Sequence, residues 1–309
     1  MDDASTPNIC QPSAGVHIVL PEYYSPRNMG FLNPETSDGR IVFLLPWEGR
    51  TVAGTTDTPT KLTFSPKPTK SEVQFILDEI KDYLSEDITV RNEDVLAAWS
   101  GIRPLVKDPK SKKTEALARN HVIDVSDGNL VTIAGGKWTT YRSMASDTVD
   151  EAVKSCRLQP EFTNCQTDGL ILEGGEGYTP NLYIKLVQDY GIDIEVARHL
   201  THCYGIKAVQ VCKEVSGPGK RLAKEFPYIE ADVKFALQEY ACTVVDVLAR
   251  RTRLAFLNVE VARDVVPRVV EIMAKELGWS SAKKQEETKE AMEYLEQMGL
   301  NLNHEQRTS

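Results

Sequence analysis

The pattern of apolar residues changes once along this 309-residue chain, and the change limits the folds open to it. Up to Ala134 the apolar residues form short runs bounded by Pro, Gly, Asp and Asn, which is typical of β-strands. From Asn181 onward they recur at helical spacing. We therefore expect a sheet-rich first half and an all-helical second half. The predicted strands are residues 16–20, 41–45, 51–53, 95–99, 121–125 and 130–134.

One amphipathic helix is expected inside the sheet-rich half. Thr69 and Glu72 have the spacing of a capping box, and apolar residues from Val73 to Leu84 fall on one helical face. A second helix, over 137–153, follows the last predicted strand. In the second half we predict helices at 182–189, 194–203, 229–257, 259–277 and 281–298, a bundle of about five or six helices.

The segment 157–180 is rich in Pro, Gly, Thr and Asn, which is typical of a linker. It divides the chain into a first domain over 1–156 and a helical domain over 181–300, followed by a tail over 301–309. The predicted fold class is therefore α+β followed by an all-α domain.

Composition excludes several classes of protein. With 36 basic and 45 acidic residues and a net charge of −9, the chain lacks the basic surface of nucleic-acid-binding proteins. Its apolar runs fall short of the ~18 residues of a membrane span. Its start resembles neither a signal peptide nor a transit peptide, so we expect no targeting segment on this chain.

The cysteines and histidines do not predict a metal site. Six cysteines are too few for a disulfide framework, and none has C-x-x-C spacing. His199, His202 and Cys203 form a local cluster, but two histidines three residues apart on a helix more often serve packing or lie on the surface. We therefore expect no bound metal and reduced thiols.

The sharpest local signal is the segment 130–142, LVTIAGGKWTTYR. A predicted strand is followed directly by two glycines, which allow a ligand to come close to the backbone. The start of the next helix offers free N–H groups that can bind an electron-rich oxygen. The segment lacks the spacing of a P-loop. The alternative is a tight turn followed by an exposed lysine. The candidates for contact with a ligand are Gly135, Gly136, Lys137, Thr139 and Thr140.

Three further residues are candidates for binding or catalysis. Arg103 lies in the apolar segment AAWSGIRPLV, where a guanidinium needs an anionic partner, either a carboxylate of the chain or an anionic group of a substrate. Arg119 offers a second cation before a strand, or is a solvated surface residue. His17 in GVHIVL is a candidate base, or a core histidine with its hydrogen bonds satisfied.

Taken together, GVHIVLP, FLLPW, AGTTDTP, LAAWSGIRPLV, ARNHVID and IAGGKWTTYRSMA resemble, in order and spacing, the FAD-dependent glycerol-3-phosphate dehydrogenase family. The segment from Phe226 to Asn258 is similar to the family's C-terminal helical domain, and Trp138 after GGK makes the chain similar to the mitochondrial enzymes of animals. The resemblance implies a DAO-type FAD-dependent oxidoreductase fold of the glutathione-reductase-like kind in the first domain. The family's N-terminal GxGxxG region and the EF-hands of animal members are not found, so a central piece is expected.

The resemblance also implies a function and roles for residues. Glycerol 3-phosphate would be oxidised to dihydroxyacetone phosphate, and electrons would pass to ubiquinone at the mitochondrial inner membrane. Gly135, Gly136, Thr139 and Thr140 would contact FAD, and Lys137 would lie beside flavin and substrate. Arg103 and Arg119 would hold the substrate phosphate, and His17 would accept the hydroxyl proton.

Two alternatives stay open, an oxidase that passes electrons to oxygen and a non-catalytic interaction module without FAD. A homo-oligomer is a possible assembly. Because no GxGxxG turn is found, we expect this chain alone to have little dehydrogenase activity.

Overall fold

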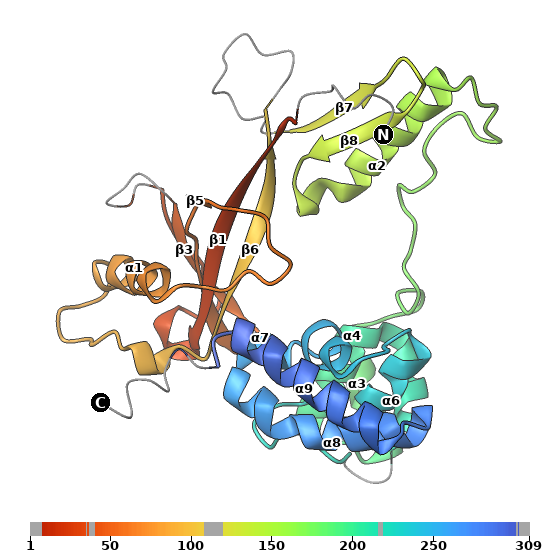
Figure 1. The fold of residues 1–309 in the computed structure, drawn as a ribbon. Coiled ribbons are helices and arrows are strands. Elements are labelled where there is room, and N and C mark those ends of the chain that lie inside the picture. The colour runs from red at the N-terminus through yellow and green to blue at the C-terminus, as the bar shows by residue number, and fades with distance from the viewer. Residues whose placement is uncertain are drawn as a thin grey trace. The chain divides into compact units, whose positions relative to one another are not determined.

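The computed structural model describes residues 8–34, 36, 41–107, 120–215, 219–300 and 302 (Figure 1). Its contacts divide the chain into two compact units. We call the first the hairpin unit, which consists of Met1–Gly15, Asp57–Phe64 and Ile102–Leu170. We call the second the sheet–helix unit, which consists of Val16–Thr56, Ser65–Gly101 and Ile171–Ser309.

The main sheet has the strand order β2-β3-β4-β1-β5, with β6 also paired to β1. Every predicted strand is present, and β1 and β6 are longer than predicted. The short strands β2 and β5 were not predicted, because two or three residues do not establish an alternating pattern. The strands are β1 (Cys10–Pro21), β2 (Phe31–Asn33), β3 (Val42–Trp47), β4 (Arg50–Gly54), β5 (Thr58–Pro59) and β6 (Ala97–Val106).

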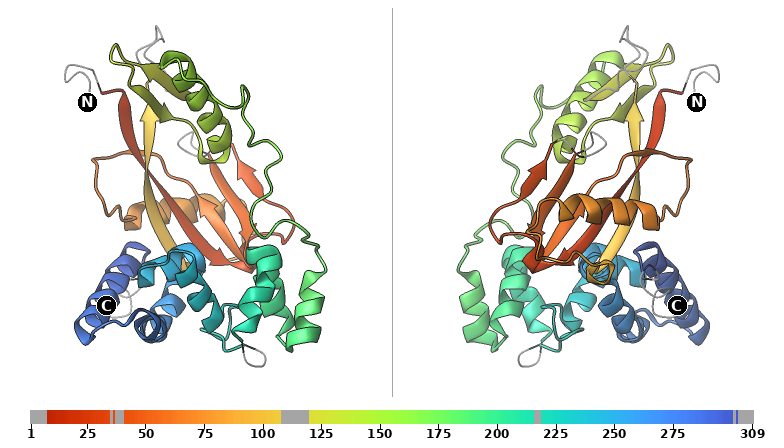
Figure 2. Two further views of the ribbon diagram at one scale, coloured as in Figure 1. Left: turned by 90° about the vertical axis from the view of Figure 1, so that its right-hand side faces the viewer. Right: turned by 90° about the vertical axis from the view of Figure 1, so that its left-hand side faces the viewer.

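Helix α1 (Lys70–Lys81) covers one face of this sheet (Figure 2). The predicted capping box is confirmed: Thr69 Oγ1 accepts a hydrogen bond from the Glu72 N–H at 3.3 Å, and Glu72 Oε2 accepts one from the Thr69 N–H at 3.0 Å. Ile76 and Ile80 are fully buried in a cluster with the β1 residues Val16, Ile18 and Leu20.

The second half is helical, as predicted, and its helices gather in one bundle (Figure 1). The structure also contains the short helix α5, which was not predicted. The helices are α3 (Leu182–Tyr190), α4 (Ile194–Tyr204), α5 (Ala208–Lys213), α6 (Glu230–Gln238), α7 (Leu254–Leu257), α8 (Val259–Leu277) and α9 (Ser281–Gln297).

The single helix predicted over 229–257 is wrong. Helix α6 ends before Tyr240, which has a φ of +70°. A new helical segment starts after it, because Asp246 Oδ2 accepts a hydrogen bond from the Thr243 N–H and Thr243 Oγ1 accepts one from the Asp246 N–H. A π-helical turn (Asp246–Arg251) then leads to α7. The T-x-x-D spacing of a capping box was the local signal for this break.

The helices share a core with the sheet. Val19 of β1 and Ala97 of β6 belong to the same buried cluster as residues of α6, α7, α8 and α9. The compact units divide the chain at several points, and one of these, between Leu170 and Ile171, lies within 157–180. The linker at 157–180 stays a prediction about domain organisation.

In the hairpin unit, β7 (His121–Val125) and β8 (Val131–Gly135) form an antiparallel pair, and α2 (Tyr141–Ser155) lies along them (Figure 2). The helix begins four residues later than predicted, because a 3-10 turn occupies Trp138–Thr140. Within the described part of the chain, no helix has the length and apolar character needed to cross a membrane.

A buried polar network joins α4 to α6. His199 Nε2 lies 3.3 Å from Asp232 Oδ1, and that carboxylate also accepts from the Tyr204 hydroxyl at 2.7 Å and the Ile229 N–H at 2.8 Å. Burial of His199 lowers its pKa, but the hydrogen bonds to Asp232 and Cys203 outweigh this and raise the pKa to about 10. His199 is therefore an imidazolium that stabilises this junction at neutral pH.

We expect Thr69→Ala to destabilise the chain by about 1 kcal/mol, because one N–H of α1 loses its acceptor. Urea unfolding followed by circular dichroism measures the change. Ser85→Ala, at an exposed position after α1, is the control. Equal effects of the two substitutions would contradict a capping role for Thr69.

We expect the free energy of unfolding to fall as the pH rises from about 7 to 10. The raised pKa of His199 provides stabilisation that is complete below the unfolded value of about 6.5 and is lost as the pH passes through about 10. The measurement is urea unfolding at several pH values, with His199→Gln for comparison. The variant should show a shallower slope, and parallel profiles would exclude His199 as the source.

Candidate active site

Arg103 on β6 has an anionic partner within the hairpin unit. Its Nη1 lies 3.3 Å from Asp57 Oδ1, and the same oxygen accepts a hydrogen bond from the Ser13 hydroxyl. The Arg103 side chain is 33% exposed and that of Asp57 is 52% exposed. Asp57 is therefore the carboxylate partner from the chain, one of the two partners expected for Arg103. Solvent still reaches this ion pair.

Gly15 on β1 provides the space for this guanidinium. A Cβ at Gly15 would lie 2.1 Å from Arg103 Nη2, closer than any real side chain could approach. Gly15, Ser13 and Asp57 were not predicted as neighbours of Arg103. A glycine within an apolar strand indicates that another group comes close to the backbone there, but it does not identify that group.

The Gly135–Gly136 turn connects β8 to the start of α2. Both glycines have positive φ, +75° and +80°. A Cβ at Gly135 would lie 3.2 Å from Val106 Cγ2, and one at Gly136 would lie 2.6 Å from Met144 Sδ. The positive φ values therefore favour glycine at both positions, and a Cβ would also force the neighbouring side chains to shift.

The residues after the turn are open to solvent. Lys137, Thr139 and Thr140 are exposed, and none of the described side chains caps the start of the 3-10 turn or of α2. Thr140 Oγ1 donates a hydrogen bond to the Lys137 carbonyl at 3.0 Å, so its hydroxyl proton is engaged within the turn. The turn thus presents exposed backbone and one lysine at the beginning of α2.

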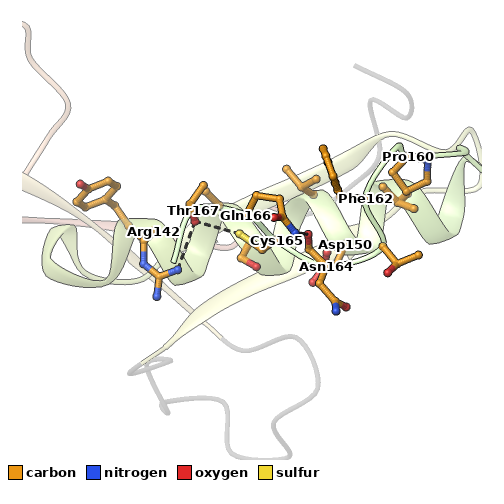
Figure 3. Close-up of a pocket in the computed structure, with 14 residues that line it drawn as sticks. Arg142, Asp150, Pro160, Phe162, Asn164, Cys165, Gln166 and Thr167 are labelled. Carbon is orange, nitrogen blue, oxygen red and sulfur yellow. Dashed lines mark hydrogen bonds between the residues drawn. The ribbon is translucent and has the colours of Figure 1, made fainter. Parts of the chain in front are cut away.

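A cavity of about 400 Å³ lies along α2 in the hairpin unit (Figure 3). Its walls come from α2, beginning at Tyr141, and from residues 160–167. At one end Arg142 Nη1 donates to Thr167 Oγ1 at 3.3 Å, and Cys165 Sγ lies 3.0 Å from the same hydroxyl. Hydrogen bonds from Thr167 and Ser146 lower the pKa of the Cys165 thiol. This cavity was not predicted, because no local sequence pattern indicates that residues 160–167 lie along α2.

His17 lies on β1 in the sheet–helix unit, opposite Gly54 on β4. Its ring is stacked on Trp99 at 5.6 Å between centroids and tilted against Phe43 at 5.5 Å. A Cβ at Gly54 would lie 2.7 Å from His17 Cδ2, so Gly54 makes room for the imidazole. His17 is half-buried among aromatic rings.

The structure describes only some of the predicted site residues. It brings Arg103 and the residues of the Gly135–Gly136 turn into the hairpin unit, whereas Arg119 lies outside the described residues. Among the residues that are described, no group of three or more His, Cys, Asp or Glu side chains is arranged to hold a metal ion.

Two family models match this chain. The FAD dependent oxidoreductase family matches residues 1–142, and the C-terminal domain of alpha-glycerophosphate oxidase matches residues 165–284. The matches agree with the predicted fold class, an oxidoreductase domain of the DAO type followed by a helical domain.

Relatives cover the chain from end to end. The mitochondrial glycerol-3-phosphate dehydrogenase of Mus musculus is 58% identical over 316 residues, which include all of this chain and 43% of the relative. A probable mitochondrial glycerol-3-phosphate dehydrogenase of Caenorhabditis elegans is 53% identical, over 95% of this chain and 42% of the relative. The chain therefore spans less than half the length of these relatives.

A solved structure agrees with the sequence comparison. The glycerol-3-phosphate dehydrogenase of Bacillus halodurans, solved in complex with FAD, is 28% identical with a TM-score of 0.76, over 94% of this chain and 57% of that chain. These findings confirm the resemblance carried by the motifs from GVHIVLP to IAGGKWTTYRSMA. The chain is homologous over its whole length to mitochondrial glycerol-3-phosphate dehydrogenases of animals, and its two parts match an FAD dependent oxidoreductase model and the C-terminal domain of alpha-glycerophosphate oxidase.

Proposed function

We propose that this chain forms the central and C-terminal part of an FAD-dependent enzyme that oxidises glycerol 3-phosphate to dihydroxyacetone phosphate. The observation that carries the proposal is the 58% identity to the mouse glycerol-3-phosphate dehydrogenase across the whole chain. The exposed backbone after Gly135 and the solvent-accessible Arg103 provide groups suited to a flavin and a phosphate.

The turn fits the edge of a flavin ring. The start of α2 carries no cap from the described side chains, and the residues from Gly136 to Thr140 are exposed, so backbone N–H groups are available to an electron-rich oxygen. We assign Gly135, Gly136, Lys137, Thr139 and Thr140 to contact with FAD. When bound, FAD supplies the acceptor for the hydride.

Arg103 suits the phosphate of the substrate. Its guanidinium offers two parallel donors, and the contact with Asp57 is made through Nη1 at 3.3 Å. Gly15 keeps the space beside the guanidinium clear. Arg119 is assigned to the same phosphate by the family resemblance.

Two residues are assigned to the chemistry at C2 of the substrate. His17 accepts the proton of the C2 hydroxyl, and its stacking on Trp99 and its contact with Phe43 fix the ring plane. Lys137 would stabilise the negative charge on the C2 oxygen as its proton leaves and on the flavin as it accepts the hydride.

We assign the protein to the mitochondrial inner membrane, with ubiquinone as the electron acceptor. The mitochondrial names of the animal relatives support the compartment. The match of residues 165–284 to the C-terminal domain of alpha-glycerophosphate oxidase supports a second candidate, an oxidase that uses oxygen. Product formation with a quinone analogue under anaerobic conditions distinguishes the two, because an oxidase would stop without oxygen.

Reconstitution with FAD tests the proposal itself. A purified full-length protein that contains this chain is incubated with FAD, and bound flavin absorbance and its bleaching by glycerol 3-phosphate are measured. Bleaching supports the proposal. A folded full-length protein that binds no flavin would contradict it and favour a non-catalytic interaction module.

In a flavin-loaded protein that contains this chain, Arg103→Lys should weaken use of glycerol 3-phosphate far more than flavin binding. Lysine keeps the charge but loses the planar pair of donors, which is worth about 1.5–3 kcal/mol. Steady-state kinetics and flavin content are the measurements. Arg91→Lys, which alters an ion pair with Asp94 in the other compact unit, is the control. Unchanged kinetics would make Arg103 a structural partner of Asp57.

Lys137→Ala should slow flavin reduction by on the order of 10²-fold, because an electrostatic group beside the reacting atoms is lost. Single-turnover bleaching of the flavin by glycerol 3-phosphate isolates this step from quinone reduction. Lys154→Ala removes an exposed lysine farther along α2 and should have no effect. Equal bleaching rates in wild type and both variants would remove Lys137 from the site.

A further inference from the structure

A cavity of about 860 Å³ lies within the sheet–helix unit and contains none of the residues assigned to the dehydrogenase reaction. Its wall comes mainly from residues 48–50 at the β3–β4 turn, from residues 195–202 of α4 and from residues 225–228. Sites for small molecules have volumes of roughly 300–1,000 Å³. The cavity is therefore large enough for a small molecule.

Arg50, the first residue of β4, lines this cavity with most of its hydrogen-bonding capacity unused. Its Nη1 donates a hydrogen bond to the Gly49 carbonyl at 2.8 Å, and its Nε is buried without an acceptor among the described residues. Its Cζ lies 5.2 Å from the centroid of the Phe226 ring, which fixes the guanidinium but accepts no hydrogen bond in its plane. The planar set of N–H donors of an arginine matches a carboxylate or a phosphate. The cavity therefore holds an oriented guanidinium with donors to spare.

Tyr228 provides a second unused donor in the same wall. Its side chain is buried, at 3% exposure, and its hydroxyl forms no hydrogen bond with any residue that the structure describes. Its ring is stacked on Phe226 at 6.1 Å between centroids and contacts the His199 ring at 4.9 Å. Burial raises the pKa of Tyr228, so the hydroxyl keeps its proton at neutral pH. Arg50 and Tyr228 both lie against Phe226 and are therefore neighbours.

The balance of charge in the wall favours an anion. Three of its four carboxylates are neutralised by arginines that do not line the cavity, whereas Glu225 is the fourth. Against Glu225 stand Arg50 and Arg198, and neither forms an ion pair within the described part of the chain. The neutralised pairs are Glu22–Arg27, Glu48–Arg253 and Glu195–Arg221. One positive charge is left uncompensated, and it attracts an anionic group.

We infer that this cavity binds a small molecule through an anionic oxygen group, a carboxylate or a phosphate, held by Arg50 and Tyr228. An oxygen anion only accepts hydrogen bonds, so it satisfies the donors that the chain leaves without acceptors. Arg198 adds a second positive charge to the wall. The inference is independent of the proposed dehydrogenase activity and of Arg103, which lies in the hairpin unit.

The first test titrates the 309-residue chain with sodium phosphate and, separately, with sodium malonate, while sodium chloride keeps the ionic strength constant. Line broadening of the ³¹P signal reports phosphate binding, and saturation transfer to the malonate protons reports malonate binding. Saturable binding of either anion supports the inference, and the anion that binds more tightly identifies the group. Absence of saturable binding of both anions would overturn it.

Substitutions assign the bound anion to the cavity. Arg50→Met should raise the Kd by on the order of ten-fold or more, because charge-assisted hydrogen bonds are lost. Arg91→Met, which removes an exposed arginine elsewhere in the same unit, is the matched control and should leave the Kd unchanged. Binding that is lost in Arg103→Lys and kept in Arg50→Met would place the anion at the proposed substrate site and overturn the inference.

Tyr228→Phe tests the site without disturbing the packing of the ring. It should raise the Kd several-fold, because one neutral hydrogen bond to the anion is lost. It should leave the free energy of unfolding without ligand unchanged, because no described residue bonds to the hydroxyl. If Arg50→Met does not fold, Tyr228→Phe still decides the question, and an unchanged Kd in this variant would overturn the inference.

Discussion

The packing of β1 on two hydrophobic cores is the constraint on which the sheet–helix unit depends. Successive side chains of a strand point to opposite faces, so one strand can serve a core on each side. Val16, Ile18 and Leu20 are buried with α1, while Val19 is buried with the helices of the second half. A shift of one residue in the pairing of β1 with β4 would exchange these sets and expose both cores. The same register fixes His17 opposite Gly54, so packing also positions a proposed catalytic residue.

Glycines determine where functional side chains fit. Gly15 leaves the space that the Arg103 guanidinium occupies, and Gly54 leaves the space beside the His17 ring. Gly135 and Gly136 bring the end of β8 close to Val106 and Met144. Each of these glycines lies next to a side chain or turn that we assign to substrate or cofactor. The backbone therefore makes room for the site at positions where a Cβ would force a neighbouring side chain to shift.

The two units contain different kinds of chemistry. The hairpin unit carries the partly exposed Arg103 guanidinium and the exposed turn before α2, which suit an external phosphate and a flavin edge. The sheet–helix unit contains a buried imidazolium and carboxylate, His199 and Asp232, whose charges compensate each other. His199 of this buried pair also lies 3.5 Å from Sγ of Cys203, which is exposed.

The sequence by itself determined the features that depend on neighbouring residues. The strands, the capping box at Thr69 and the strand–glycine–helix segment follow from spacings of two to four residues, and the motifs around them identified the family. The roles of His17, Arg103, Arg119 and Lys137 stay predictions. Only the tertiary structure decided which groups meet across long separations. It placed Asp57 against Arg103 and Asp232 against His199, and it broke the predicted helix over 229–257. Local periodicity carries no information about such pairs, because they form only when packing brings distant segments together.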